Sequence, residues 1–127
     1  MNPQDSLPWR VRDGHVHLLA SRRAATGGQP ARLRFPPLPA TSPLAAGSEL
    51  VELGPTGRLY SFTIVHAAPK LGKPPVPLGL VDFDEGLRIF GRMHYAQGRR
   101  PVIGETLRVV IDDSEQGPIY AFEPEPR

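Results

Sequence analysis

The chain contains no cysteine, which excludes a disulfide framework and any metal site built on thiolate ligands. It also lacks an apolar run long enough to span a bilayer. The beginning, MNPQDSLPWR, has neither the charged start nor the apolar middle of a signal peptide. No segment repeats apolar residues at a long helical spacing. These absences predict a cytoplasmic protein of the all-β class with no membrane segment.

Motifs for enzymatic chemistry are missing as well. There is no glycine-rich phosphate loop, and Ser61 and Thr63 stand in no nucleophile-elbow context. His15 and His17 would share one face of a strand, but no further residues complete a set of metal ligands. His66 is better suited to a polar strand end than to a catalytic base. The sequence therefore predicts no catalytic residue and no bound metal.

Proline and glycine are abundant, with 16 and 13 residues, which is typical of short strands joined by turns. Strand-like apolar runs lie at 14–21, 31–35, 49–53, 58–66, 78–83, 87–93, 106–111 and 119–122. The last five runs, with a loop or short helix at 95–103, favour a five-stranded OB barrel. We expect Ile111 to point inward, and the aromatic side chains of Tyr60, Phe62 and Phe90 fit the barrel core as well as a binding surface.

A proline-rich segment at 36–48 divides the chain into two regions. Residues 1–40 are expected to form a short helix or arm followed by a β-hairpin that turns at 26–30. Residues 41–127 are expected to form the barrel. Arginine outnumbers acidic residues within 1–40, which suits a solvated basic surface and would also suit an acidic partner or a phosphate.

Two groups of residues are candidates for contact with other molecules. The first is a cationic rim on two loops, which would suit phosphate groups if both loops open on one side of the barrel; its members are Lys70, Lys73, Arg92, Arg99 and Arg100. The second is a set of aromatic interface anchors, namely Trp9, Phe35 and Tyr95.

Five sequence segments together resemble the acyl-CoA-associated OB-fold family, also catalogued as domain of unknown function 35. They are HLLASRR at 17–23, RLRFPPLP at 32–39, GRLYSFTIVHAAP at 57–69, PLGLVDFDEGLRIFGRM at 77–93 and IGETLRVVIDD at 103–113. The resemblance implies an N-terminal helix, a rubredoxin-like zinc ribbon and an OB barrel. It also departs from the family at both places where cysteine pairs are common, since RRAATGGQ and ATSPLAAG contain none. The hairpin is therefore expected to be metal-free and held by packing of Leu18, Leu33 and Phe35 or by a partner.

The resemblance implies a non-catalytic accessory subunit that binds a thiolase-superfamily enzyme, whether a thiolase, an acyltransferase or an aldolase. The subunit would help to form that enzyme's acyl-CoA site, with a coenzyme A thioester at the interface and no firmly bound cofactor. The alternative is a single-stranded nucleic-acid-binding OB-fold protein. Because acidic residues outnumber basic ones in 41–127, this alternative ranks second, and a free-standing enzyme ranks third.

Overall fold

The computed structural model describes residues 7–23, 28, 32–37, 47–66, 72, 75–96, 98–114 and 117–125. All regular structure in these ranges is β-strand, as predicted, and they contain no helix of the length and apolar character needed to cross a membrane. The chain divides into two compact units, Met1–Pro55 with Asp84–Leu87, and Thr56–Phe83 with Arg88–Arg127.

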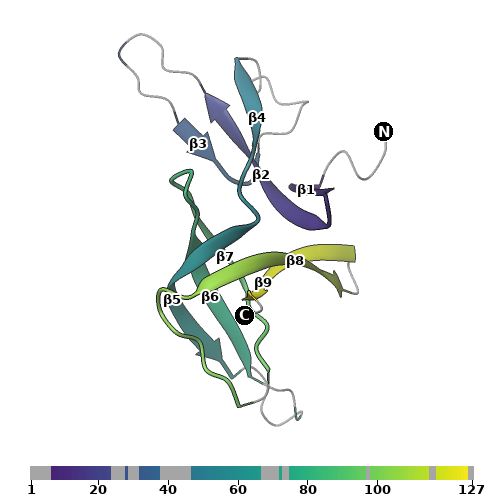
Figure 1. The fold of residues 1–127 in the computed structure, drawn as a ribbon, viewed down its shortest axis with the longest axis vertical. Helices are drawn as coiled ribbons and strands as arrows, with labels where there is room; N and C mark the ends of the chain where they lie inside the picture. The colour runs from purple at the N-terminus through teal and green to yellow at the C-terminus, as the bar shows by residue number, and fades with distance from the viewer. Residues whose placement is uncertain are drawn as a thin grey trace. The chain divides into compact units, whose positions relative to one another are not determined.

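The first unit is a four-stranded antiparallel sheet arranged around one long strand, β2 (His15–Arg23) (Figure 1). The first half of β2 pairs with β1 (Trp9–Arg12), and its second half pairs with both β3 (Arg32–Arg34) and β4 (Ser48–Glu52). Because β4 pairs with β2, the first unit extends past residue 40 to Pro55. β2 and β3 pair antiparallel, as the predicted hairpin requires, and its expected turn at 26–30 lies outside the described residues except for Gly28.

The N-terminal helix or arm is replaced, over residues 9–12, by strand β1. The reason is that β2 offers a sheet edge at His15–Leu18, and β1 satisfies the backbone groups along it. The main-chain N–H of Leu19 also donates to the carbonyl of Pro8 at 2.8 Å. Packing around β2 is dense, and the buried apolar residues of this unit are Trp9, Leu18, Leu19, Ala20 and Leu53.

The second unit is a five-stranded antiparallel sheet in the order β7-β6-β5-β8-β9 (Figure 1). A parallel bridge between Met93, just after β7, and Phe122 of β9 joins the two ends of the sheet. The sheet is thus a nearly closed OB barrel, which confirms the predicted fold. Its strands are β5 (Thr56–Val65), β6 (Val76–Asp82), β7 (Arg88–Arg92), β8 (Thr106–Ser114) and β9 (Gly117–Pro124).

The barrel closes around buried apolar side chains, of which Phe122, Leu107 and Val81 have no exposed surface. Two facing glycines, Gly79 and Gly91, line the inside of strands β6 and β7. A Cβ atom added to Gly91 would lie 2.6 Å from a ring atom of Phe122. This glycine therefore provides room for an aromatic ring of the core.

The structure decides one question that the sequence left open, the place of three aromatic side chains, and corrects one expectation, the direction of Ile111. Tyr60 and Phe90 are 49% and 55% exposed, and Phe62 is 39% exposed, so the aromatic residues are not core residues. Tyr60 follows the buried Leu59 in ordinary alternation, and the bulge between Leu59 and Ser61 leaves it without a register partner on β6. Ile111, expected to point inward, is 36% exposed.

Candidate functional site

An exposed aromatic and basic surface lies on the outer face of strands β5, β6 and β7. Leu59, Val81 and Ile89 are register partners across these strands and are all buried. The next set of partners must therefore point the opposite way, toward solvent. That outer set includes Leu80 opposite Phe90, with Arg88 and Arg92 two residues to either side. We call this surface, with Tyr60, the Tyr60–Phe90 face.

A cation–π contact organises one end of the Tyr60–Phe90 face. The guanidinium carbon of Arg88 lies 3.3 Å from the centre of the Tyr60 ring. Nε of Arg88 also donates to Oδ1 of Asp82, its register partner, at 2.7 Å. The hydrogen bond with Asp82 raises the pKa of Arg88 above its ordinary value. Arg88 is thus held over the Tyr60 ring, while Phe90 beside it remains open to solvent.

The loop between β7 and β8 is held by one carboxylate, that of Glu105. Its Oε2 accepts hydrogen bonds from the Tyr95 hydroxyl at 2.9 Å and from the Val102 main-chain N–H at 2.6 Å. Its Oε1 accepts from Arg99 at 2.8 Å. The Glu105 side chain is only 12% exposed, so three donors compensate its partial burial. We call these four residues the Glu105 cluster.

Two tyrosines of the barrel unit have a raised pKa. For Tyr95 the causes are burial and then the hydrogen bond to Glu105, since both favour the neutral phenol over a phenolate beside a carboxylate. For Tyr120 the cause is burial, and its hydroxyl donates to the carbonyl oxygen of Phe90 at 2.6 Å. Both phenols therefore act as hydrogen-bond donors at neutral pH.

Five residues were predicted to form a cationic rim. Lys70 and Lys73 lie outside the described residues. Arg92 and Arg100 are exposed, and in the described part of the barrel unit neither has a carboxylate partner. Arg99 is paired with Glu105 and lies 5.7 Å from the centre of the Tyr95 ring. The contact of these residues with acyl-CoA or a partner stays a prediction.

The predicted interface anchors differ in the surface that they offer. Trp9 is buried, with 8% of its surface exposed, so little of its ring is available to a partner. Phe35 is half-buried. Tyr95 is half-buried, and its hydroxyl is engaged by Glu105. Phe90 is more exposed than any of the three, and it alternates along β7 with the buried residues Ile89 and Gly91.

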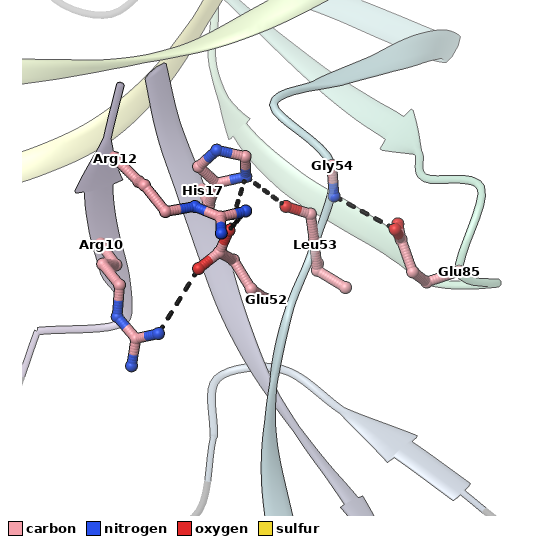
Figure 2. Close-up of polar contacts among 7 residues, drawn as sticks. All are labelled: Arg10, Arg12, His17, Glu52, Leu53, Gly54 and Glu85. Atoms are coloured by element: carbon pink, nitrogen blue, oxygen red, sulfur yellow. Dashed lines mark hydrogen bonds and ion pairs between the residues drawn. The ribbon is translucent and has the colours of Figure 1, made fainter. Parts of the chain in front are cut away.

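The first unit holds a second polar cluster, which Figure 2 shows in close-up. The Glu52 carboxylate, on β4, binds Arg12 of β1 at 2.6 Å and Arg10 at 3.4 Å. Nδ1 of His17, on β2, lies 2.8 Å from the carbonyl oxygen of Leu53 and 3.4 Å from Glu52. Because a carbonyl only accepts, Nδ1 carries the proton. Glu52 therefore links β4 to β1, the strands on either side of β2. His17 of β2 adds to this link through the contacts of its Nδ1 with Leu53 and Glu52.

Neither cluster has the composition of a catalytic or metal centre. Among the described residues, no three His, Asp or Glu side chains gather so that they could hold a metal ion. His94 and Asp112 form an ion pair on the barrel, but no hydroxyl nucleophile adjoins them in any hydrogen bond of the described residues. The described surface exposes aromatic rings and arginines, and these side chains are suited to binding a partner or a ligand.

The fold and this surface define a class: an OB-fold domain preceded by a small antiparallel sheet. Comparison with known proteins gives the family. The family model described as "ChsH2, C-terminal OB-fold domain" matches residues 50–112. The benzoylsuccinyl-CoA thiolase subunit BbsA of Thauera aromatica is 31% identical over 115 residues, which are 87% of this chain and 78% of that protein. The chain belongs to the acyl-CoA-associated OB-fold family, known as DUF35.

Two further relatives match this chain over only part of their own length. The alpha subunit of the 3-oxo-4,17-pregnadiene-20-carboxyl-CoA hydratase of Mycobacterium tuberculosis is 34% identical over 113 residues, and this chain spans 35% of its length. A DUF35 domain-containing scaffold protein of Methanocaldococcus jannaschii is 28% identical over 85 residues, 60% of each chain. A solved chain of the Ltp2-ChsH2(DUF35) aldolase superposes with a TM-score of 0.63 at 24% identity, covering 85% of this chain and 84% of that one, and this likeness shows the fold.

Proposed function

We propose that this protein is an accessory subunit that docks on a thiolase-like or aldolase-like enzyme and helps to form that enzyme's acyl-CoA site. Its relatives support the proposal, since they include a thiolase subunit, a hydratase subunit and a scaffold protein. The chain itself is proposed to be non-catalytic. Its contribution is to bind the partner and to shape the passage of the coenzyme A thioester.

The observation that carries this proposal is the exposure of the Tyr60–Phe90 face. Phe90 is 55% exposed on a rigid strand, and the Arg88 guanidinium beside it is already fixed on Tyr60. Aromatic and arginine side chains are enriched in the energetically dominant parts of protein interfaces. Such a side chain loses little conformational freedom on docking when its strand is already ordered.

The test is co-expression with a thiolase-like or aldolase-like protein from the same organism, followed by size-exclusion chromatography with light scattering. The wild-type chain is expected to form a stable complex. Phe90→Ser is expected to weaken it by about 2 kcal/mol, or about thirtyfold, as for a central aromatic anchor.

A matched control is Ile119→Ser, which removes another exposed apolar side chain, 47% exposed, from strand β9. The control is expected to retain the complex. Failure of the wild-type chain to bind would reject the accessory role, whereas equal behaviour of the two variants would reject only the placement of the interface on the Tyr60–Phe90 face.

One observation favours a second candidate function, the binding of single-stranded nucleic acid. Aromatic rings are exposed on the barrel, and OB barrels stack bases on such rings. However, Arg88 already covers the ring of Tyr60 at 3.3 Å, so that face of the ring is not free to stack on a base. The accessory role therefore remains first, and fluorescence anisotropy with a labelled oligonucleotide tests the alternative.

A further inference from the structure

Among the described residues, a group of three arginines on the first unit has no carboxylate partner. Arg23 of β2 is the direct register partner of Arg32 of β3, and Arg34 is the partner of Ser21. Arg23, Arg32 and Arg34 therefore lie on the same face of this antiparallel pair. All three are exposed. We call them the arginine face.

The register brings their charges close together. Side chains directly opposite each other in an antiparallel pair have Cβ atoms about 5 Å apart, and diagonal neighbours lie about 7–8 Å apart. Arg23 thus faces Arg32 directly and Arg34 diagonally. Like charges in direct opposition destabilise a strand pair, so this arrangement costs folding free energy unless an anion lies between the guanidinium groups.

The rest of the unit shows how its other arginines are neutralised. On the opposite face of the same strands, Arg22 donates from Nε to Glu49 at 2.7 Å. Arg10 and Arg12 both bind Glu52. On the arginine face, β4 places Ser48 opposite Arg23 and Leu50 opposite Ser21, and neither of these β4 residues carries a charge. In the described part of this unit, carboxylates therefore pair with every arginine except the three that converge.

We propose that the arginine face binds a phosphate group of a ligand. Guanidinium groups bind phosphate oxygens in bidentate fashion, and several converging guanidiniums distribute the charge of a phosphate monoester or diphosphate. This inference goes beyond the proposed function, because it places a ligand site on the small sheet and does not depend on partner docking. Only the choice of coenzyme A as the first probe rests on the proposed function.

The test is isothermal titration of the full-length chain with coenzyme A, dephospho-coenzyme A and inorganic diphosphate at low ionic strength. Arg32→Glu is expected to weaken binding of coenzyme A and diphosphate at least about tenfold, because it removes one donor and neutralises Arg23. Dephospho-coenzyme A is expected to bind more weakly than coenzyme A to the wild-type chain. Binding is expected to fall as salt is raised.

A stability measurement separates a ligand site from a general loss of structure. Without ligand, Arg32→Glu is expected to melt at the same temperature as the wild type or higher, because it replaces a repulsion by an ion pair. Diphosphate is expected to raise the melting temperature of the wild type but not that of the variant. The control is Arg22→Gln, on the opposite face, which is expected to bind coenzyme A as the wild type does.

Equal binding of coenzyme A and diphosphate to wild type and Arg32→Glu would overturn the proposal, as would the absence of any salt-sensitive binding to the wild type. If an oligonucleotide, and not coenzyme A, loses affinity in Arg32→Glu, the phosphate chemistry stands and its source is a nucleic acid. Because the docking test uses Phe90 of the barrel, either result leaves the proposed accessory role to be judged separately.

Discussion

At the scale of single residues, the Glu105 carboxylate has the largest structural role in the described part of the barrel unit. It accepts from two side chains and one main-chain N–H. The adjoining backbone is bonded to β5, since Gly104 donates to the Leu59 carbonyl at 2.7 Å and Leu59 donates to that of Glu105 at 3.0 Å. One acidic side chain therefore fixes the loop that carries Arg99 and Arg100.

We expect Glu105→Ala to lower the free energy of unfolding by about 2 kcal/mol, because it leaves the Val102 N–H and the Tyr95 hydroxyl without their acceptor. Chemical denaturation measures this change. Arg99→Gln, which removes only an exposed ion pair, is expected to cost about 0.5 kcal/mol or less. Equal losses in the two variants would show that the ion pair, and not the hydrogen bonds from Val102 and Tyr95, stabilises the loop.

Residue-scale roles were only partly predictable. In the sequence, Arg88, Phe90 and Arg92 alternate with the apolar Leu87, Ile89 and Met93, which predicts that the three share a face, and the burial pattern of β7 agrees. Nothing in the sequence indicated that Glu105 accepts from Tyr95, because the pairing depends on how a loop folds back. The same applies to Arg23 opposite Arg32, since the register of a hairpin is set by its turn and its packing.

At the scale of strands, the glycines decide how closely the barrel closes. A Cβ at Gly57 would lie 2.8 Å from the main-chain oxygen of Asp82, and one at Gly91 would lie 2.6 Å from the Phe122 ring. One at Gly79 would lie 2.5 Å from the sulfur of Met93. Only the last neighbour is a flexible side chain that can move aside.

We therefore expect Gly57→Ala and Gly91→Ala to cost about 2–3 kcal/mol each, as overpacking of a closed core does. Gly79→Ala is expected to cost about half as much or less, because Met93 can change its rotamer. Thermal unfolding followed by circular dichroism ranks the three variants. A larger loss for Gly79→Ala than for Gly91→Ala would contradict this account of the core.

Most of the strands were predictable from alternation and turn residues, because a half-buried strand has a period of two. The strand at Trp9–Arg12 was missed, since it is short and follows polar residues, and it forms only because β2 offers an edge. The bulge at Leu59/Ser61 was also missed. It adds one residue, Tyr60, that has no partner on β6, and so shifts the register of the rest of β5.

At the scale of the whole molecule, the two tyrosines with raised pKa values predict the response of stability to alkaline pH. Above the ordinary value of 10.0, the unfolded chain releases these phenolic protons while the folded chain keeps them. The unfolded state then binds fewer protons, so the free energy of unfolding falls as the pH rises. The contribution is fully present below pH 10.

We expect the midpoint of denaturant unfolding to fall as the pH is raised from about 10 to about 11, and to fall less in a chain that carries both Tyr95→Phe and Tyr120→Phe. Absorbance of tyrosinate should show these two groups ionising together with unfolding. The same slope in wild type and double variant would show that other groups cause the alkaline loss.

By itself, the sequence determined the all-β class, the OB barrel and the family, because alternation, turn residues and the order of motifs are local properties that a chain carries before it folds. Only the tertiary structure decided which side chains form a surface. The cation–π pair of Tyr60 and Arg88, the Glu105 cluster and the arginine face each bring together residues from different strands or loops. Strand register, bulges and long-range hydrogen bonds determine which side chains come together, and these features arise from packing of the whole domain.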